Sequence, residues 1–563
     1  MKTTPVASPI ILGLLLVGTA GCNDHPVKPT EYESVGVGNA KVAIHVNKDV
    51  DILFVMDNSG SMGEEQAALA ANFERFIEKL EADDVRANYR IGITTTDNGN
   101  VACGGTTPEA GHLVLSSCRG RTQEFVFNGA GGMVDATDEA CLDICPEEWS
   151  TIETLPTSIT DGGETKPRPW IENIGGRTNL PEGLTTTQAF QCLGPQGVAG
   201  CGFESHLESM YLALKRAETD GEESQGFIRD NAILAVVHLT DEADCSENKD
   251  QSDAFSPLGN RVLWTDPEAG SATSAVCWNA GVECTGDPSN FDECHSVDRD
   301  IDGNLIDDPD RAATDAILRP VDRYVSYLQG FEDRKQDDPL LRDQEVLVAV
   351  IGGVDDTGNA TYAMSGSDQF RGDFGIGPGC TSTAGEAVPP VRLAEFADEF
   401  DTGEQNMFSI CNNDYSIALE QIANAIRDQI KPSCMTECVM DTNPTTPELD
   451  PLCTLEQSYR GSDGRLVTDP IPKCAADGSM PSDATDVCYI ALTDGLQPDP
   501  QDKASREFLS MDESDDMSED CAADGFNLEF DVRRRDGVPA PSGTSVAAQC
   551  QLSQQPQIEC PGL

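Results

Sequence analysis

Short, continuous runs of apolar residues recur along the first 430 residues of the chain. Such runs, rather than alternation of apolar and polar residues, are typical of strands buried on both faces of a parallel sheet. They predict strands at residues 52–56, 89–96, 233–239, 346–351 and 406–411.

A second pattern, with apolar residues three or four positions apart, falls between these runs and predicts amphipathic helices. The first helix opens near Glu64, and similar faces recur at residues 207–214, 393–400 and 419–430. The apolar face of the first of these helices carries Leu69, Phe73, Phe76, Ile77 and Leu80. Alternating strands and helices predict an α/β fold, a doubly wound and mainly parallel sheet with helices on both faces.

This α/β domain would span residues 41–430, about twice the length that such a domain needs. The surplus lies in residues 97–202 and 245–344, which are rich in Gly, Pro, Asp and Cys. We expect both to be long insertions pinned by disulfides in surface loops, the second with a helix near residues 320–330.

Composition changes after residue 430, where Pro, Asp and Cys become frequent and apolar runs become short. Residues 527–532 alternate between apolar and polar, as a half-buried strand does. Residues 431–563 therefore predict a small, Cys-rich C-terminal domain with β content.

The N-terminus has an apolar run at residues 10–20, the length of a signal-peptide core and too short for a membrane span. It ends in a tetrapeptide, Thr19 to Cys22, that resembles the bacterial lipobox, although Thr19 stands where Leu is usual. The resemblance implies a signal peptide over residues 1–22, lipidation of Cys22 and a tether over residues 23–40. An ordinary secretory signal with a chance Cys is the alternative.

The cysteine count supports export. Of 21 Cys, Cys22 is set aside for lipidation and 20 remain, 12 from Cys103 to Cys411 and eight from Cys434 to Cys560. Both counts are even, so each region can form its own disulfides, and so many thiols are unusual in a reducing cytosol. The spacing of Cys141 and Cys145 is the only one that suggests a local pair.

The chain of 563 residues has 98 Asp and Glu against 37 Lys and Arg, a formal net charge of −61. No basic face can be assembled from this balance to displace counterions from a phosphate backbone. Nucleic acids are therefore excluded as expected partners.

Oxygen donors gather where two predicted strands end. Asp57, Ser59 and Ser61 follow the first strand, and Asp241 follows Thr240 at the end of the strand at 233–239. Ligands of open α/β sheets bind at this carboxyl edge. Carboxylates beside hydroxyls suit a hard divalent cation, Mg²⁺ first, with Mn²⁺ or Ca²⁺ as alternatives.

The Asp-x-Ser-x-Ser sequence with a later Thr-Asp resembles the metal-ion-dependent adhesion site (MIDAS) of von Willebrand factor type A (vWA) domains. The resemblance implies that Ser59 and Ser61 coordinate the cation directly, and that Asp57 and Asp241 hold it, often through water. An acidic group on a partner would complete the shell. The alternative is structural: the two Ser residues would cap the helix that follows.

One ligand of that family does not match. Members usually supply a Thr from a Gly-x-Thr loop that opens a middle helix, whereas here Glu204 stands at that place, in Gly202-Phe203-Glu204. The rival is Thr178, which has the right residue type but no obvious helix after it. With Glu204 as a ligand, three carboxylates would hold the cation more tightly and leave it less charge with which to attract a partner's carboxylate.

A second metal loop is suggested by residues 298–304, which match the start of a calcium loop. The bidentate Glu expected at the twelfth position is replaced by Pro309. The candidate ligands of an additional Ca²⁺ are Asp298, Asp300, Asp302 and Asn304, and a solvated acidic loop is the alternative.

These features predict a cell-envelope lipoprotein, anchored in the outer membrane or at the cell surface, that binds a protein or surface ligand in a metal-dependent way. An enzyme is not expected, because common catalytic motifs are missing from the sequence. A structural envelope protein whose cation only stabilises the fold is the first alternative. A secreted metallohydrolase that uses the inserted acidic loops is the second.

Overall fold

The computed structural model describes residues 39–560 with gaps. The gaps are residues 45–47, 83–84, 130–131, 159–164, 230–231, 337–345, 383–384, 431–432, 444–448, 461–465, 476, 483, 494–516, 518–520, 523–524, 536–537 and 539–544. The expected signal peptide, Cys22 and nearly all of the tether lie outside the described residues.

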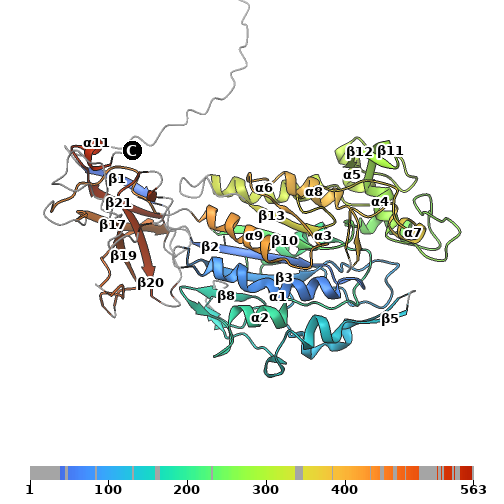
Figure 1. The fold of residues 1–563 in the computed structure, drawn as a ribbon, viewed down its shortest axis with the longest axis horizontal. Coiled ribbons are helices and arrows are strands. Elements are labelled where there is room, and N and C mark those ends of the chain that lie inside the picture. The colour runs from blue at the N-terminus through green and yellow to red at the C-terminus, as the bar shows by residue number, and fades with distance from the viewer. Residues whose placement is uncertain are drawn as a thin grey trace, which may run out of the picture.

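A seven-stranded, mostly parallel sheet forms the centre of the molecule (Figure 1). Its strands, in spatial order, are β16 (Met407–Ser409), β13 (Leu347–Gly352), β10 (Ile233–Leu239), β2 (Asp49–Met56), β3 (Asn88–Thr95), β8 (Ile171–Ile174) and β9 (Arg177–Thr178). The first five are parallel, whereas β8 and β9 add an antiparallel edge. The sequence-based strands within 52–56, 89–96, 233–239, 346–351 and 406–411 are all confirmed.

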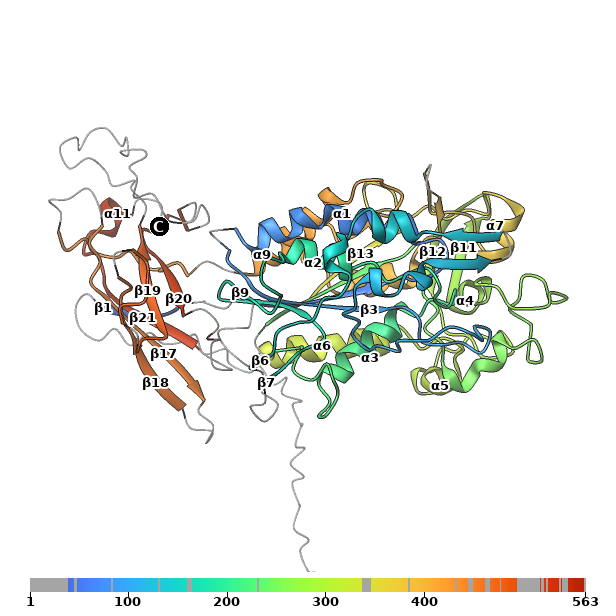
Figure 2. The ribbon, with the colours of Figure 1, turned by 90° about the horizontal axis from the view of Figure 1, so that it is seen from below.

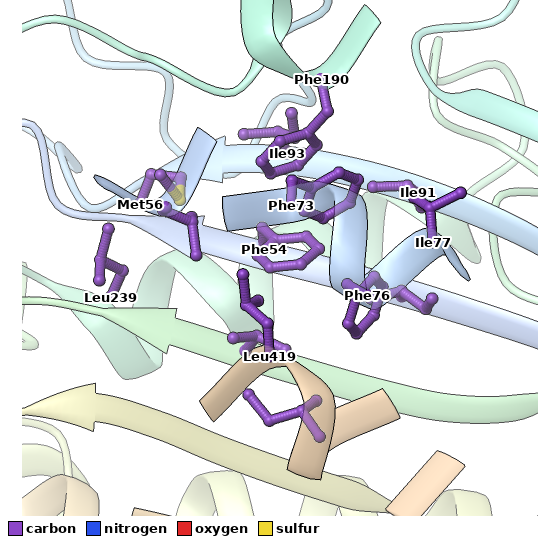
Figure 3. Close-up of a cluster of buried hydrophobic side chains, with 14 of the residues drawn as sticks. Phe54, Met56, Phe73, Phe76, Ile77, Ile91, Ile93, Phe190, Leu239 and Leu419 are labelled. Carbon is purple, nitrogen blue, oxygen red and sulfur yellow. The ribbon is translucent and has the colours of Figure 1, made fainter. Parts of the chain in front are cut away.

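Helices cover both faces of this sheet (Figure 2). One face holds α1 (Gly63–Leu80), α2 (Thr186–Leu193) and α9 (Ser416–Gln429); the other holds α3 (His206–Ala217), α6 (Asp322–Gln336) and α8 (Val391–Asp398). Figure 3 shows the first core, in which Phe54 of β2 meets Phe73 of α1 edge to face at 5.8 Å between ring centroids. Phe190 of α2 stacks on the same Phe73.

The two long inserted ranges are more integrated than the sequence indicated. β8, β9 and α2 of the first range extend the sheet and its core, and α6 of the second range packs on the opposite face. The remaining inserted elements lie outside the central layers. They are β4 (Val126–Gly129), β5 (Gly132–Asp135), β6 (Thr157–Ser158), β7 (Thr165–Lys166), α4 (Ala275–Gly281), β11 (Val282–Asp287), β12 (Asn290–Ser296) and α5 (Pro309–Asp315).

Further short elements connect the layers. Between β13 and α8 lie α7 (Asp368–Phe374), β14 (Cys380–Thr381) and β15 (Glu386–Ala387). Single turns of 3₁₀ helix occur at Cys118–Gly120, Thr122–Phe125 and Glu147–Trp149, a longer one at Lys249–Phe255, and a π turn at Asp138–Leu142.

A separate antiparallel sheet follows the central layers (Figure 1). Its strand order is β1 (Asn39–Ile44), β21 (Ser545–Gln551), β17 (Cys453–Arg460) and β18 (Leu466–Ile471), beside the pair β19 (Val487–Leu492) and β20 (Glu529–Arg534) and the short α11 (Pro556–Glu559). β1 pairs with β21, so the α/β layers begin at β2 rather than at residue 41. Lys48 and Arg86 both pair with Asp531 of β20, at 3.8 and 3.5 Å.

Ten disulfides pin the described chain, and each region pairs its own cysteines as the counts predicted. Six lie in the first region: 103–201, 118–141, 145–192, 245–277, 284–294 and 380–411. Four lie in the second: 434–521, 438–560, 453–550 and 474–488. The suggested local pair is wrong, because Cys141 and Cys145 bond Cys118 and Cys192 instead. So many disulfides indicate an exported protein.

Candidate metal centre

The adjacent strands β2 and β10 bring the two predicted acidic motifs together. Met56 is in register with Leu239, so the next residues, Asp57 and Thr240, emerge side by side at the carboxyl edge. The amide of Asp57 donates to the carbonyl oxygen of Leu239 at 3.0 Å. The Thr240 hydroxyl donates to Oδ2 of Asp57 at 2.6 Å, which fixes the orientation of this carboxylate.

The loop after β2 places both hydroxyls beside this edge. The amide of Ser59 donates to Oδ1 of Asp57 at 2.8 Å, and the hydroxyl oxygens of Ser59 and Ser61 lie 3.3 Å apart. Ser61, which is exposed, is also close to the carboxylate of Asp241. Helix α1 begins after Met62 without a side-chain cap. The hydroxyls therefore face each other and the acids, which disfavours the helix-capping alternative.

Glu204 lies at this edge, in the loop that enters α3. It is fully buried, and Oε2 accepts a hydrogen bond from Thr96, which follows β3. Its rival, Thr178, lies at the opposite edge of the sheet, because it pairs with Asn173, which pairs with Tyr89 near the start of β3. Of the two candidates, only Glu204 is beside the other predicted ligands.

Glu242 is a fourth acid at this edge that the sequence analysis did not single out. Its amide donates to the Thr240 hydroxyl at 2.9 Å, and the residue is only 7% exposed. Its place directly after Asp241 was the available signal: a second acid at the end of a buried strand.

Burial and mutual repulsion raise the pKa of three of these acids. For Glu204, Asp241 and Glu242, loss of water contributes most, and the nearby carboxylate of Asp57 adds to it in each case. Glu65 in the first turn of α1 follows the same trend, because burial raises its pKa to about 7. Without a cation, burial and repulsion therefore favour the protonated form of these clustered acids.

Basic groups do not neutralise this cluster. Among the described residues, no Lys or Arg forms an ion pair with Asp57, Glu204, Asp241 or Glu242. The buried His206 ring is 3.8 Å from Asp57 and equally far from Asp244, and Asp244 is already paired with Arg392 at 3.0 Å.

Several oxygens at this edge are buried without a hydrogen-bond partner, a costly state unless a cation or water occupies the space between them. They are Asn58 Oδ1, Glu204 Oε1, Asp241 Oδ1 and Glu242 Oε2. All are hard oxygen donors, the type that Mg²⁺ and Ca²⁺ prefer. The described residues nevertheless hold no group of three or more His, Cys, Asp or Glu side chains in a metal-binding arrangement. The donor chemistry therefore fits a cation, without a complete coordination shell being formed.

The predicted calcium loop has a different arrangement. Oδ1 of Asp300 accepts from the amides of Asp302 and Asn304 at 3.1 and 2.9 Å, and Oδ2 pairs with Arg311 at 2.9 Å. Asp302 accepts instead from Asn260. Because a guanidinium already holds Asp300, the loop resembles a closed turn more than a cation site; Asp298 lies half-buried beside it.

Comparisons with known proteins identify no family. No family model and no curated protein matches the sequence. Two solved structures of the pilus adhesin SpaC from Lactobacillus rhamnosus GG, one in an open conformation, are similar at 10% and 11% identity and a TM-score of 0.25. This chain is covered to 92%, but it spans only 41% and 40% of the adhesin chains. A TM-score this low does not establish a common fold. Within the described part of the chain, no helix is long and apolar enough to cross a membrane.

Proposed function

We propose that this chain is a cell-envelope lipoprotein that displays a vWA-like domain for divalent-metal-dependent binding of a protein or surface ligand. The observation that carries the proposal is the set of buried, unpartnered carboxylate oxygens at the carboxyl edge, with which no described Lys or Arg forms an ion pair. A mostly parallel sheet with helices on both faces, and Asp-x-Ser-x-Ser after β2, support the vWA-like assignment.

In this proposal Ser59 and Ser61 coordinate the cation directly, and Asp57, Glu204 and Asp241 hold it from the protein side. Bound Mg²⁺ or Mn²⁺ would supply a positive charge that attracts an acidic group of the partner. Ser61 is exposed, whereas Asp57 and Glu204 are buried. The partner would therefore approach from the Ser61 side.

The membrane anchor is the lipidated Cys22. In the structure 20 of the 21 Cys form disulfides, so the remaining one is Cys22, the residue at the lipobox-like sequence. Mass spectrometry of the exported protein tests this assignment: a lipid on an N-terminal Cys22 is the expected result, and cleavage elsewhere with a free Cys22 would contradict it.

Thermal unfolding of the oxidised chain tests the cation site, in EDTA and with Mg²⁺, Mn²⁺ or Ca²⁺. A cation that binds only the folded state adds about 2.7 kcal/mol at 100 times its dissociation constant, which raises Tm by a few degrees. We expect Ser59→Ala to lose this increase and Ser289→Ala, an exposed hydroxyl in the β11–β12 hairpin, to keep it. If none of the three ions changes the Tm of the wild type, the proposed cation site is refuted.

A structural role for the cation is the second candidate. It is favoured by the number of carboxylates at the site. Four carboxylates carry more negative charge than one divalent ion can balance, so little positive charge would remain to attract a partner. Attachment of cells or beads that carry the protein separates the two candidates. Attachment that EDTA abolishes at a temperature where the fold survives supports metal-dependent binding, and attachment that EDTA leaves unchanged supports the structural role.

A further inference from the structure

The first inserted range lies directly against the proposed cation loop. Its residues 196–200 are held there by Gln66 of α1, which donates to the carbonyl oxygens of Asp57 and Gly197 at 2.7 and 2.8 Å and accepts from the amide of Gln196 at 2.8 Å. The amide of Gly200 donates to the carbonyl oxygen of Asn58 at 2.9 Å. A Cβ on Gly200 would lie 2.2 Å from Asn58 Oδ1, so the two loops touch without space for a side chain.

A disulfide closes this range next to Glu204. Cys103 and Cys201 join its two ends across a sequence separation of 98 residues. The amide of Cys201 donates to Asp97 at 3.2 Å, and the amide of Ser205 donates to the carbonyl oxygen of Thr96 at 3.0 Å. The backbone is thus fixed on both sides of Glu204, which limits where its carboxylate can lie.

The second inserted range reaches the same place through Ser274. The Cys245–Cys277 disulfide and helix α4 hold this residue, and its hydroxyl is 2.7 Å from the carbonyl oxygen of Gly202 in the first range. The Ser274 oxygen is also close to the carboxylate of Glu242, although its one proton is donated to Gly202. The other oxygen of Glu242, Oε2, is buried without a partner.

We infer that Glu242 is a further ligand of the proposed cation, and that the two disulfide-pinned ranges position Glu204 and Glu242 to enclose it from the protein side. The inference rests on the proposed cation site. Glu242 is close enough to Asp57 and Asp241, and Glu204 to Glu242, for their carboxylates to repel one another, so one cation among them would lower the repulsion that each acid experiences. Such an ion is resident: it binds before the partner and stays after the partner leaves.

Isothermal titration of Mn²⁺ into the full, oxidised chain tests this inference. Loss of one carboxylate in Glu242→Gln should weaken binding by about tenfold or more, the size of effect seen when a group that supports a metal site is removed. The matched control is Glu283→Gln, whose carboxylate pairs with Arg299 in the second range, and it should bind like the wild type. Unfolding in EDTA confirms that each variant is folded.

The disulfide is tested in the same titration. Cys103→Ser with Cys201→Ser should weaken Mn²⁺ binding, whereas Cys284→Ser with Cys294→Ser, in the distant β11–β12 hairpin, should not. If the first double variant does not fold, Gly200→Ala replaces it, because its Cβ would clash with the Asn58 side chain in the proposed cation loop.

The two levels of the argument fail separately. If the wild type binds no Mn²⁺, Mg²⁺ or Ca²⁺, the proposed cation site itself is wrong. If the wild type binds Mn²⁺ and Glu242→Gln binds equally well, the site stands and the role of Glu242 is overturned. If Glu242→Gln is weaker but loss of the Cys103–Cys201 bond has no effect, the positioning role of the inserted range is overturned.

Discussion

The two ends of the central parallel strands, called here the amino edge (where the strands begin) and the carboxyl edge (where they end), compensate their buried charges in different ways. At the amino edge, Arg229 donates to Asp51 at 2.9 Å and pairs with Asp49 at 3.0 Å, and Arg90 pairs with Glu172 at 3.0 Å. At the carboxyl edge, Asp57, Glu204, Asp241 and Glu242 lie together, and no Lys or Arg of the described chain pairs with them. Both edges are buried, so the difference is in the partners and not in the solvent.

This contrast separates structural charges from charges that await a ligand. A buried carboxylate is tolerated when hydrogen bonds or a cation compensate for its lost hydration. The chain supplies that compensation itself at the amino edge. At the carboxyl edge the described residues supply hydroxyls, amides and the His206 ring but no Lys or Arg, and several oxygens are left unpartnered. The carboxyl edge is therefore the part of the fold where an external cation would add most.

The largest expected effect comes from removing the compensation at the amino edge. Arg229→Met removes the ion pair of Asp51, which is 0% exposed, and should lower the free energy of unfolding by about 3–5 kcal/mol. Urea unfolding measures this loss. Arg75→Met, which breaks the solvent-exposed pair with Glu78, is the control and should change little. Equal losses in the two variants would remove the distinction between buried and exposed pairs.

A smaller effect concerns His238, a buried base on β10 between the two edges. Burial, with a contribution from the neighbouring His206, lowers its pKa from 6.5 to about 3. In the unfolded chain the imidazole takes up a proton near pH 6.5, whereas in the fold it stays neutral. Stability from this group is therefore complete above pH 6.5 and is lost as the pH falls toward 3, by about 2 kcal/mol at pH 5. Urea unfolding at pH 7 and pH 5 should show a shallower pH dependence in His238→Leu; an unchanged slope would contradict the assignment.

The sequence was most informative where local pattern determines structure. The strand at 233–239 was located to the residue, because a buried parallel strand is continuously apolar. The aligned ends of β2 and β10 then placed Asp57 and Asp241 together. The sequence failed where distant contacts decide: α2 joins the core because Phe190 stacks on Phe73, more than 100 positions away. The prediction that Cys141 pairs with Cys145 was wrong for the same reason, because their partners, Cys118 and Cys192, are brought close by tertiary contacts.

Glu242 shows a second limit of sequence. Adjacent acids at a strand end look equivalent, yet Asp241 is half-buried near the exposed Ser61, whereas Glu242 is buried and repels Glu204. Only the positions of the inserted ranges, which are fixed by tertiary contacts, distinguish them. Thr178 illustrates the converse: it has the expected residue type but lies at the wrong edge.

At the carboxyl edge, removing a charge should stabilise the metal-free protein. Because the pKa of Glu204 is raised in the fold, its stability contribution is complete below the unfolded pKa near 4.5 and is lost as the pH rises through the folded value. Glu204→Gln should therefore gain about 1 kcal/mol or more over the wild type in EDTA at pH 8. With saturating Mn²⁺ the order should reverse, since the wild type alone keeps the full ligand set. If Glu204→Gln were instead less stable than the wild type in EDTA, the chain itself would stabilise the charged form of Glu204, and the contrast between the two edges would not hold for this residue.

The smallest expected effect tests how the acids of the loop at residues 298–304 are compensated. They could be paired with arginine, as at the amino edge of the sheet, or need a cation, as we propose for the carboxyl edge. One of the loop's acids, Asp300, is paired with Arg311 and accepts hydrogen bonds from two backbone amides, as a structural charge does. Asp300→Asn should therefore shift Tm by less than about 2 °C and leave the number of Ca²⁺ or Mn²⁺ ions bound per chain unchanged. Titration calorimetry and equilibrium dialysis both measure this number. A fall by one bound ion per chain would show that this loop holds a cation. In that case an arginine partner on an acid would not be enough to mark it as a purely structural charge.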